Sequence, residues 1–246
     1  MSKPRKPIAR RKRSAASRLK PFWILLVLFA AIFIIGGYYV ATWPGFRAGQ
    51  VAVIGNHRVA TREILRRADV HRRVNIWLQD MRAVADRVAA IPDVGSVTVL
   101  RGFPASLSIV VHERSPFAVV RSGAATAVTD RQMRVLTAPA GPRLPRFLVT
   151  VNLPKPGQFI RNERVVALRD DYELLTAADV IIVSLQYDRF GDLVAMTPRG
   201  VQILLGDDAD LKRKAALIGP ILSQVAGKKI AAIDLRAPGT PVVKYR

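Results

Sequence analysis

The chain has 246 residues, a formal net charge of +21, half of its residues hydrophobic and no cysteine. Without cysteine it has no disulfide, no thiolate nucleophile and no cysteine metal site. Nine of its 39 Lys and Arg lie in the first 21 residues, which leaves 30 against 18 acids, a net of +12, for the rest. That rest lacks the aromatic interleaving and motifs of a nucleic-acid module, so we expect no nucleic-acid partner.

The first 42 residues predict a membrane anchor. The twenty residues from Phe22 to Ala41 carry no charge. At about 1.5 Å per residue they cover roughly the 30 Å of a bilayer's hydrocarbon core. We therefore expect a basic cytoplasmic tail at 1–21, a transmembrane helix at 22–42 and a C-terminus on the outer face, because excess Lys and Arg stay inside. Trp23, Tyr38, Tyr39 and Trp43 mark its two ends, where aromatic rings favour the headgroup region.

Two other interpretations of the apolar run were weighed. A cleaved signal peptide has a shorter apolar core and a small-residue cleavage site, where this chain has Tyr38, Tyr39 and Trp43. A helix buried in a soluble core would need equally apolar partners on every face. The net +12 of the remainder indicates either weak contact with anionic lipid or cell-wall polymer, or simply a well-solvated surface.

The segment 43–50, with Pro44, Gly45 and Gly49, predicts a short stalk. A β-α-α-β-β order follows. Val51 to Ile54 predict a strand and Thr61 is expected to cap a helix. A second helix is expected after Asp80 as its cap, and two strands alternate along Val97 to Arg101 and Leu107 to Val111. Two helices on one face of a small sheet make an α+β domain.

The end of this region resembles a known pattern. The run from Arg101 to Ala118, RGFPASLSIVVHERSPFA, is similar to the R-x-aromatic-P-x-x-L-x-I-x-V-x-E-R-x-P-x-A motif of the bacterial cell-division FtsQ (DivIB) family. Val53-Ile54-Gly55-Asn56 and Ile91-Pro92-Asp93-Val94 resemble two further elements of that family. The residues that match this motif or mark the domain junction are Gly55, Asn56, Arg101, Phe103, Pro104, Glu113, Arg114 and Pro116.

The resemblance implies a POTRA domain at 51–114 followed by a β domain at 115–246. Pro104 and Gly102 are expected to shape the hairpin connection, and Pro116 to force an extended exit. Glu113 and Arg114 are expected either to form an interdomain salt bridge or to be a solvated strand end. After Asp130 the family commonly has a turn glycine, where this chain has Arg131-Gln132-Met133.

Beyond Pro116 the pattern predicts a mostly β domain with helices packed on an antiparallel sheet. The expected strands are 117–120, 126–128, 135–136, 180–187, 193–197, 201–205, 230–235 and 242–245, with helices at 161–177 and from Asp210 to the stop at Gly227. Asp207, Asp208 and Asp210 precede the second helix, so we interpret them as capping residues rather than a metal or acid-base site.

We find no catalytic constellation and expect no enzyme activity, metal or cofactor. A domain without visible chemistry that ends in strands suggests binding by strand addition to an exposed sheet edge. The resemblance implies the same: a segment of FtsB, which accompanies FtsL, pairs with the final strands. The candidate partner-binding residues are Asp234, Leu235, Arg236, Val242, Val243, Lys244 and Tyr245.

Other interpretations stand beside these expectations. Val242 to Tyr245 are the last strand of a core sheet in the simplest interpretation. Pro238, after the D-L-R match, and Pro241 cannot donate backbone hydrogen bonds and would interrupt pairing there. The competing function is a POTRA-bearing subunit of protein export or outer-membrane assembly. A third function, an anchored cell-wall hydrolase, would need a metal site or a catalytic nucleophile, and we find neither pattern in the sequence. The prediction is a non-catalytic, single-pass inner-membrane scaffold of the divisome, concentrated at the septum.

Overall fold

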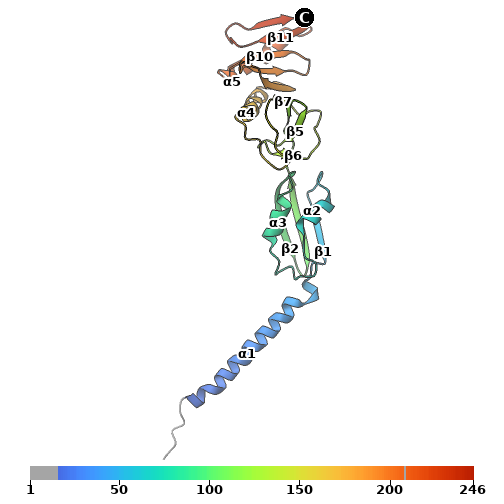
Figure 1. The fold of residues 1–246 in the computed structure, drawn as a ribbon, viewed down its shortest axis with the longest axis vertical. Coiled ribbons are helices and arrows are strands. Elements are labelled where there is room, and N and C mark those ends of the chain that lie inside the picture. The colour runs from blue at the N-terminus through green and yellow to red at the C-terminus, as the bar shows by residue number, and fades with distance from the viewer. Residues whose placement is uncertain (1–15, 208) are drawn as a thin grey trace, which may run out of the picture. The chain divides into compact units, whose positions relative to one another are not determined.

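The computed structural model describes residues 16–207 and 209–246 of the chain (Figure 1). The described chain divides into two compact units. The first contains the chain up to Ala52 together with Val70–Asp80 and Arg101–Ser108. The second contains Val53–Asp69, Met81–Leu100 and Ile109–Arg246.

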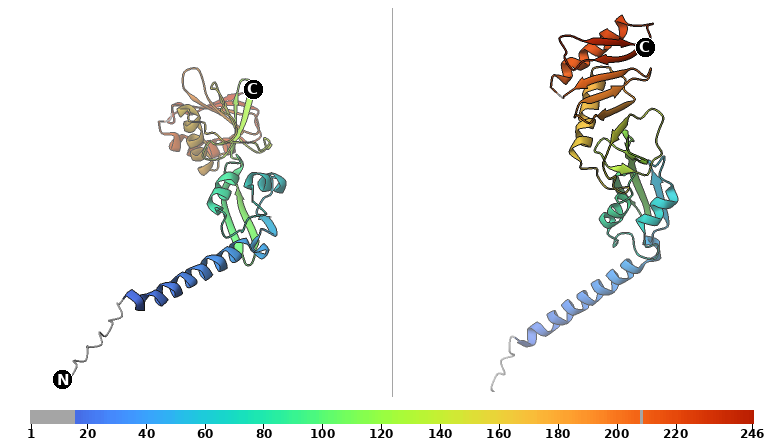
Figure 2. Two further views of the ribbon diagram at one scale, coloured as in Figure 1. Left: turned by 60° about the horizontal axis from the view of Figure 1, so that its bottom comes forward. Right: turned by 45° about the horizontal axis from the view of Figure 1, so that its top comes forward.

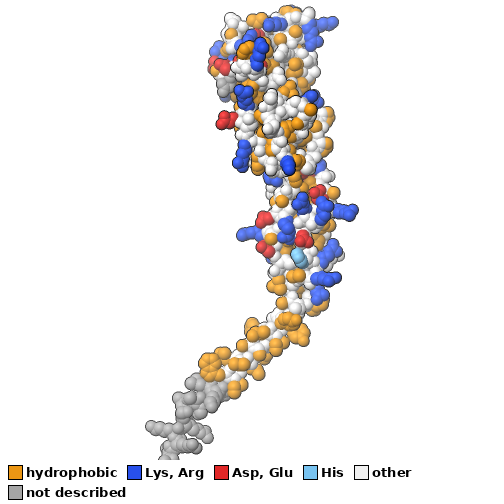
Figure 3. Space-filling view, viewed as in Figure 1, with side chains coloured by type: hydrophobic (Ala, Val, Ile, Leu, Met, Phe, Trp, Pro, Cys, Tyr) orange, Lys and Arg blue, Asp and Glu red, His pale blue; other side chains and the backbone are white. Residues whose placement is uncertain are grey.

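Helix α1, Ala16–Thr42, contains the predicted anchor. Its segment Phe22–Thr42 is long and apolar enough to cross a membrane. Its large apolar side chains are exposed, as the hydrophobic colouring in Figure 3 shows. Burial in a soluble core of this chain is therefore wrong as an alternative. Of the predicted basic tail, residues 1–15 lie outside the described residues, and the helix already begins at Ala16.

The segment 43–50, for which a short stalk was predicted, lies against other loops of the first unit. It contains a short 3-10 helix, Pro44–Phe46, and then runs against two loops of the first unit. The Phe46 carbonyl accepts the Ile76 N–H at 2.9 Å, and the Gly49 N–H donates to the Ala105 carbonyl at 3.1 Å. These two backbone hydrogen bonds fix the chain where it leaves α1.

The β-α-α-β-β order is confirmed. The elements are β1 (Gln50–Ile54), α2 (Thr61–Ala68), α3 (Met81–Ala89), β2 (Val94–Gly102) and β3 (Ser106–Glu113). The strands form one sheet in the order β1-β3-β2. The alternation along β3 buries Leu107, Ile109 and Val111, and the helices bury Ile64, Val84 and Val88. The expected Thr61 cap is wrong, because Ala60 holds the N-cap position of α2 and no side chain caps it.

The rest of the chain forms a nine-stranded sheet with two helices. Its elements are β4 (Ala118–Ser122), β5 (Ala125–Thr129), β6 (Val135–Leu136), β7 (Arg146–Val149), α4 (Glu163–Ala177), β8 (Ser184–Tyr187), β9 (Leu193–Met196), β10 (Gln202–Gly206), α5 (Leu211–Gln224), β11 (Ile230–Asp234) and β12 (Val242–Tyr245). The strand order is β12-β11-β10-β9-β8-β7-β4-β5-β6. Figure 2 shows the C-terminal strands following one another at one end of this sheet.

The sheet is mixed rather than antiparallel as predicted. β4 pairs with β7, β7 with β8 and β10 with β11 in parallel, and the other neighbours are antiparallel. The physical reason lies in the connections. α4 connects β7 to β8 and α5 connects β10 to β11, and a helical crossover returns the chain in the same direction. Antiparallel neighbours can instead be joined by a direct turn, as between β8 and β9.

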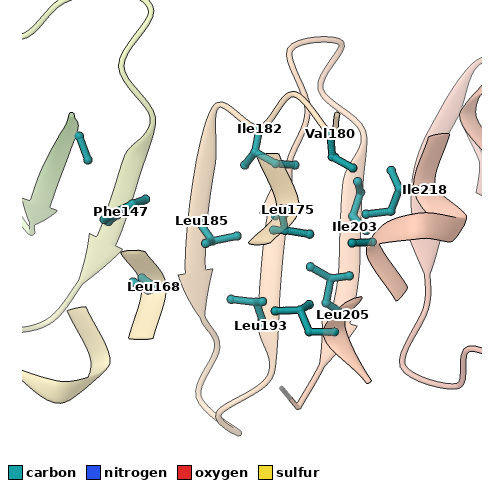
Figure 4. Close-up of a cluster of buried hydrophobic side chains, with 14 of the residues drawn as sticks. Phe147, Leu168, Leu175, Val180, Ile182, Leu185, Leu193, Ile203, Leu205 and Ile218 are labelled. Atoms are coloured by element: carbon teal, nitrogen blue, oxygen red, sulfur yellow. The ribbon is translucent and has the colours of Figure 1, made fainter. Parts of the chain in front are cut away.

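The hydrophobic core of the chain from Ala118 onward lies between the nine-stranded sheet and the helices α4 and α5. Figure 4 shows Phe147, Leu185, Leu193, Ile203 and Leu205 from the sheet together with side chains from α4 and α5. The helical partners and the segment before β8 contribute Leu168, Leu175, Val180, Ile182 and Ile218. This large shared cluster holds the sheet, including its last strands, on one scaffold.

The acidic group before α5 differs from its predicted capping role. Asp210 occupies the N-cap position, but its φ is 57° and its side chain makes no cap hydrogen bond. Asp207 instead accepts two hydrogen bonds from the buried Lys214 ammonium, each at 3.0 Å. Asp208 lies outside the described residues. α5 also contains Pro220, which the helix prediction did not take into account.

Candidate partner-binding surfaces

Strand β12 forms one end of the nine-stranded sheet. It pairs antiparallel with β11, with Val242 opposite Asp234 and Val243 opposite Ile233. On its other side no strand of the described chain follows. An edge strand of this kind presents unpaired N–H and C=O groups to any extended segment that approaches.

The direction of each backbone group along β12 follows from its register. The Arg246 N–H donates to the Lys229 carbonyl at 2.9 Å, so Arg246 faces inward. Successive residues of a strand point their backbone groups to opposite sides. The register shifts between Ile230 and Ala232, but the Leu235 N–H donates to the Leu204 carbonyl of β10, which turns Asp234 and Ala232 toward β12. Their partners Val242 and Lys244 therefore face β11, and the N–H and C=O groups of Val243 and Tyr245 face the open edge.

The β12 side chains differ in exposure. Val243 is partly buried against the main core, which anchors the strand. Val242 and Tyr245 are more than half exposed. The Lys228 ammonium lies 5.6 Å from the centre of the Tyr245 ring. The strand therefore combines a fixed backbone with two exposed apolar side chains beside its free edge.

The Asp234-Leu235-Arg236 match has a structural role at the end of β11. The Arg236 guanidinium donates to the Asp234 carboxylate at 2.6 Å and 3.0 Å. These side-chain bonds, with the Arg236 backbone N–H, hold the pKa of Asp234 below its usual range although burial opposes them. Leu235 is buried, and its N–H donates to the Leu204 carbonyl at 2.8 Å. Only Arg236 of the three is exposed enough to meet a partner.

Pro238 and Pro241 lie in the connection between β11 and β12. This loop is closed by a hydrogen bond from the Thr240 N–H to the Ala237 carbonyl at 3.1 Å. The interruption expected from the two prolines therefore falls before β12 begins at Val242. All four residues of β12 retain their N–H groups.

A second group of predicted residues forms a tight turn after β1. Gly55 has a φ of +85°, and a Cβ atom at this position would lie 2.4 Å from the Val111 carbonyl oxygen. The Asn56 amide donates to the Val59 carbonyl at 2.9 Å and to the Thr61 hydroxyl at 3.1 Å. Only glycine fits the first position, and Asn56 ties the turn to the start of α2.

Glu113 closes the same turn from the end of β3. Its Oε1 accepts the N–H groups of His57, Arg58 and Val59 at 2.8 to 2.9 Å. The Arg58 guanidinium lies 3.3 Å from Oε2, and the Glu113 side chain is only 7% exposed. Burial alone would raise the pKa of Glu113, but the three backbone donors and Arg58 together lower it.

Replacing Glu113 with glutamine is expected to lower the free energy of unfolding at pH 7 by about 2 kcal/mol, because hydrogen bonds to a charged acceptor are lost. A carboxylate whose folded pKa is depressed stabilises the fold above its unfolded pKa, and the stabilisation disappears as pH falls. Glu113→Gln should therefore lose less stability than the unchanged protein between about pH 5 and pH 3. Urea unfolding of the full chain in detergent micelles measures both effects.

The control is Glu63→Gln, which removes a carboxylate from the exposed side of α2 where it pairs weakly with Arg66 at 4.0 Å. We expect it to change stability by less than about 0.5 kcal/mol. Equal effects of the two substitutions, or an unchanged pH profile for Glu113→Gln, would contradict the role assigned to Glu113.

The predicted interdomain salt bridge involves Arg114 and not Glu113. The Arg114 guanidinium lies 2.6 Å from Asp130 Oδ2 and donates to the Val94 carbonyl at 3.1 Å. It also donates to the Gln132 side chain at 3.1 Å. Arg114 thus joins the end of β3 to the start of β2 and to the turn after β5. Pro116 lies in the extended segment that leads to β4.

Two aspartates at this junction were missed as functional residues. The second oxygen of Asp130 accepts the N–H groups of Gln132 and Arg134, each at 2.9 Å. Met133 in the same turn has a φ of 62°, so it takes the left-handed conformation that a glycine commonly supplies. Asp93 accepts the Thr137 and Ala138 N–H groups at 3.2 Å and the Thr137 hydroxyl. An aspartate at the start of a turn was the available signal.

The remaining motif residues lie in the β2-β3 hairpin of the first unit. Arg101 donates to the carbonyls of Ile76 at 2.9 Å and Gln79 at 2.6 Å. The Phe103–Pro104 peptide bond is cis, and the Phe103 ring is exposed. The motif therefore marks three places in the structure: this hairpin, the turn closed by Glu113 and the junction held by Arg114.

Among residues 16–207 and 209–246, no group of three or more His, Asp or Glu is placed to hold a metal ion. The arrangement offers backbone hydrogen bonds at β12 and fixed charged contacts at the junction. Of these two features, the open edge of β12 is the one at which an extended segment of another protein can add as a strand.

Comparison with known proteins agrees with this geometry. Residues 46–114 match the family model for the FtsQ-type POTRA domain. The chain is 27% identical to the cell division protein FtsQ of Mycobacterium tuberculosis over 250 aligned positions, covering 98% of this chain and 73% of that protein. It is 26% identical to FtsQ of Chloroflexus aurantiacus, covering 85% and 77%. A shorter match to FtsQ of Syntrophotalea carbinolica has 37% identity over 76 residues, covering 31% and 27%.

Proposed function

Because this chain belongs to the FtsQ family of cell-division proteins, we propose that it is a non-catalytic scaffold that links early and late components of the divisome. It has one membrane-spanning helix, and residues 51–114 and 115–246 act as its POTRA and β domains. The observation that carries the proposal is the free edge of β12.

Binding at this edge takes place by strand addition. A partner segment pairs with the outward N–H and C=O groups of Val243 and Tyr245 and packs its side chains beside Val242 and Tyr245. The partners are small division proteins of the FtsB and FtsL type. Arg236, at the end of β11, supplies an exposed guanidinium near the strand's first residue, where it favours an acidic side chain of the partner.

The chain is oriented with its N-terminus in the cytoplasm and its C-terminal domains in the periplasm. The support is the sequence of residues 1–21, which has nine Lys or Arg and no acid. Such a tail remains on the cytoplasmic side. This orientation places β12 where the exterior segments of other division proteins can reach it, and the protein gathers at the division septum.

The proposal is tested by depleting the protein and by following a fluorescent fusion to its N-terminus in dividing cells. We expect filamentous cells on depletion and fluorescence concentrated at midcell during constriction. Uniform fluorescence around the cell periphery during constriction would contradict the proposal. Normal septation combined with stalled outer-membrane assembly would instead identify a protein-export subunit.

A further inference from the structure

Exposed apolar side chains cluster on three loops of the first unit. We call this the apolar loop surface and define it by Trp43, Phe46, Val74, Trp77, Leu78 and Phe103. Phe103 is 79% exposed and Leu78 is 67% exposed, and only Phe46 of the six is partly buried. An exposed apolar cluster of this kind marks an interaction site, because its members gain nothing from contact with water.

The rings of this surface contact one another across segments that are distant in sequence. The centres of the Trp43 and Phe46 rings lie 5.0 Å apart, and those of Phe46 and Phe103 lie 6.1 Å apart. The Trp77 indole N–H donates to the Pro104 carbonyl at 3.2 Å. The loops 43–49, 70–80 and 101–108 thus form one continuous, fixed surface rather than separate flexible tips.

This surface is fixed directly to the end of α1. The Asn75 side-chain amide donates to the carbonyl of Ala41, in the last turn of α1, at 3.2 Å. Trp43 follows the apolar segment Phe22–Thr42 without a spacer. When α1 crosses a bilayer, the attached loops therefore lie at the depth of the lipid headgroups, where Trp and other amphipathic rings are most favourable.

The charges on the same loops are mostly positive. Within residues 43–52, 70–80 and 101–108, the basic residues Arg and Lys number four and the acidic residues number one. They are Arg47, Arg72, Arg73 and Arg101 on the basic side and Asp80 on the acidic side. Arg72 and Arg73 are exposed beside Val74. The Arg101 guanidinium lies 5.9 Å from the centre of the Trp77 ring. Apolar rings rimmed by arginines match the chemistry of an anionic phospholipid surface.

We propose that the apolar loop surface inserts into the interface of the same bilayer that α1 crosses, with its arginines on anionic phospholipid headgroups. The first unit is then held on the membrane by two contacts, the spanning helix and this surface. The proposal requires only that α1 spans a membrane and does not depend on the β12 partner.

The test uses the full chain in lipid nanodiscs with Trp23→Phe and Trp43→Phe, so that Trp77 alone emits. Phospholipids brominated high on the acyl chain quench indoles that enter the interface. The reference protein carries Trp77→Phe and Phe190→Trp in the same background, because Phe190 is 75% exposed in the nine-stranded unit. We expect several-fold stronger bromolipid quenching of Trp77 than of the reference indole, and weaker quenching of Trp77 by aqueous acrylamide.

Equal bromolipid quenching of the two indoles would overturn the proposal. Protection of Trp77 from acrylamide without bromolipid quenching would also overturn it and would identify a protein, such as a second copy of the chain, as the cover. Comparing nanodiscs of zwitterionic lipid with nanodiscs rich in phosphatidylglycerol separates the contribution of the apolar side chains from that of the arginines. We expect stronger quenching of Trp77 in the anionic discs than in the zwitterionic discs. The double substitution Arg72→Gln and Arg73→Gln should remove that difference. Quenching that does not depend on lipid charge in the unsubstituted protein would overturn the role of the arginines.

A matched pair of substitutions tests the apolar contribution without threatening the fold. Leu78→Glu changes an exposed residue of the apolar loop surface, and Ile181→Glu changes an equally exposed apolar residue of the second unit. Leu78→Glu should reduce bromolipid quenching of Trp77 several-fold, whereas Ile181→Glu should leave it unchanged. Equal effects of the two would contradict insertion.

Discussion

Replacing Val243 with proline is expected to weaken the strand addition proposed for β12 while leaving the nine-stranded sheet folded. The Val243 N–H faces away from β11, so its loss removes no hydrogen bond within the chain. Proline also fits the extended backbone of an edge strand. An incoming strand, however, loses a hydrogen bond and meets the pyrrolidine ring. We expect at least about a tenfold loss of affinity, equivalent to 1.4 kcal/mol.

The matched control is Lys244→Pro, one residue further along β12. The Lys244 N–H faces β11, where Lys244 pairs with Ala232. This substitution should weaken the sheet itself and lower the stability of the full chain. Co-purification with candidate division proteins of the proposed partner type, together with urea unfolding in detergent micelles, distinguishes the two variants. Undiminished partner capture by a folded Val243→Pro protein would remove β12 from consideration.

Replacing Gly55 with alanine is expected to destabilise the POTRA domain by about 3 kcal/mol or more, because overpacking is added to an unfavourable backbone conformation. The added Cβ atom would lie 2.4 Å from the Val111 carbonyl oxygen, which is backbone of β3 and cannot rotate away. The turn would have to shift, and with it the three N–H groups that Glu113 accepts.

Gly191→Ala separates the clash from the backbone effect. Gly191 has a φ of +90°, close to that of Gly55, but an added Cβ atom meets nothing within 4 Å. We expect a loss of only about 1 to 2 kcal/mol there, which is the ordinary penalty for a left-handed alanine. Pulse proteolysis of the full chain in urea measures both variants. Similar losses of unfolding free energy at the two positions would show that the clash with the Val111 carbonyl does not add to the cost of Gly55→Ala.

Local patterns predicted the elements of the fold well. The uncharged run from Phe22 was sufficient for α1, and the alternation along 107–111 was sufficient for the buried face of β3. The final strand at 242–245 matched β12 to the residue. These features depend on periodicity within one element, which the sequence displays directly.

What escaped prediction depends on contacts between distant segments. Arg146–Val149 was not recognised as strand β7, although it pairs with both β4 and β8. Short buried strands carry too few residues to show a period, and only the crossover through α4 explains their parallel pairing. Arg114 and Asp130 are 16 residues apart, so the sequence around either residue gives no sign that the two form an ion pair.

The helix caps failed for a related reason. Thr61 and Asp210 are residue types that favour N-caps, but one stands at the first helical position and the other makes no cap bond. In the turn before α2, the backbone N–H groups donate hydrogen bonds to the Glu113 carboxylate, which is more than fifty residues away in sequence. Capping propensity describes an isolated helix, whereas here the Thr61 hydroxyl accepts the Asn56 amide at 3.1 Å and so belongs to the turn that precedes α2.

The two ends of the nine-stranded sheet are not equivalent, and this limits what the chain can assemble. At the β6 end, the Val135 N–H already donates to the Gln158 carbonyl, and Val135 accepts the Gly157 N–H in return. Only the β12 end remains free within the described chain. The nine-stranded sheet therefore offers one free edge, and copies of it cannot add head to tail by extending this sheet, since that would require two free edges on the same sheet. A single free edge on this sheet favours a complex of defined stoichiometry over a fibre of repeated copies.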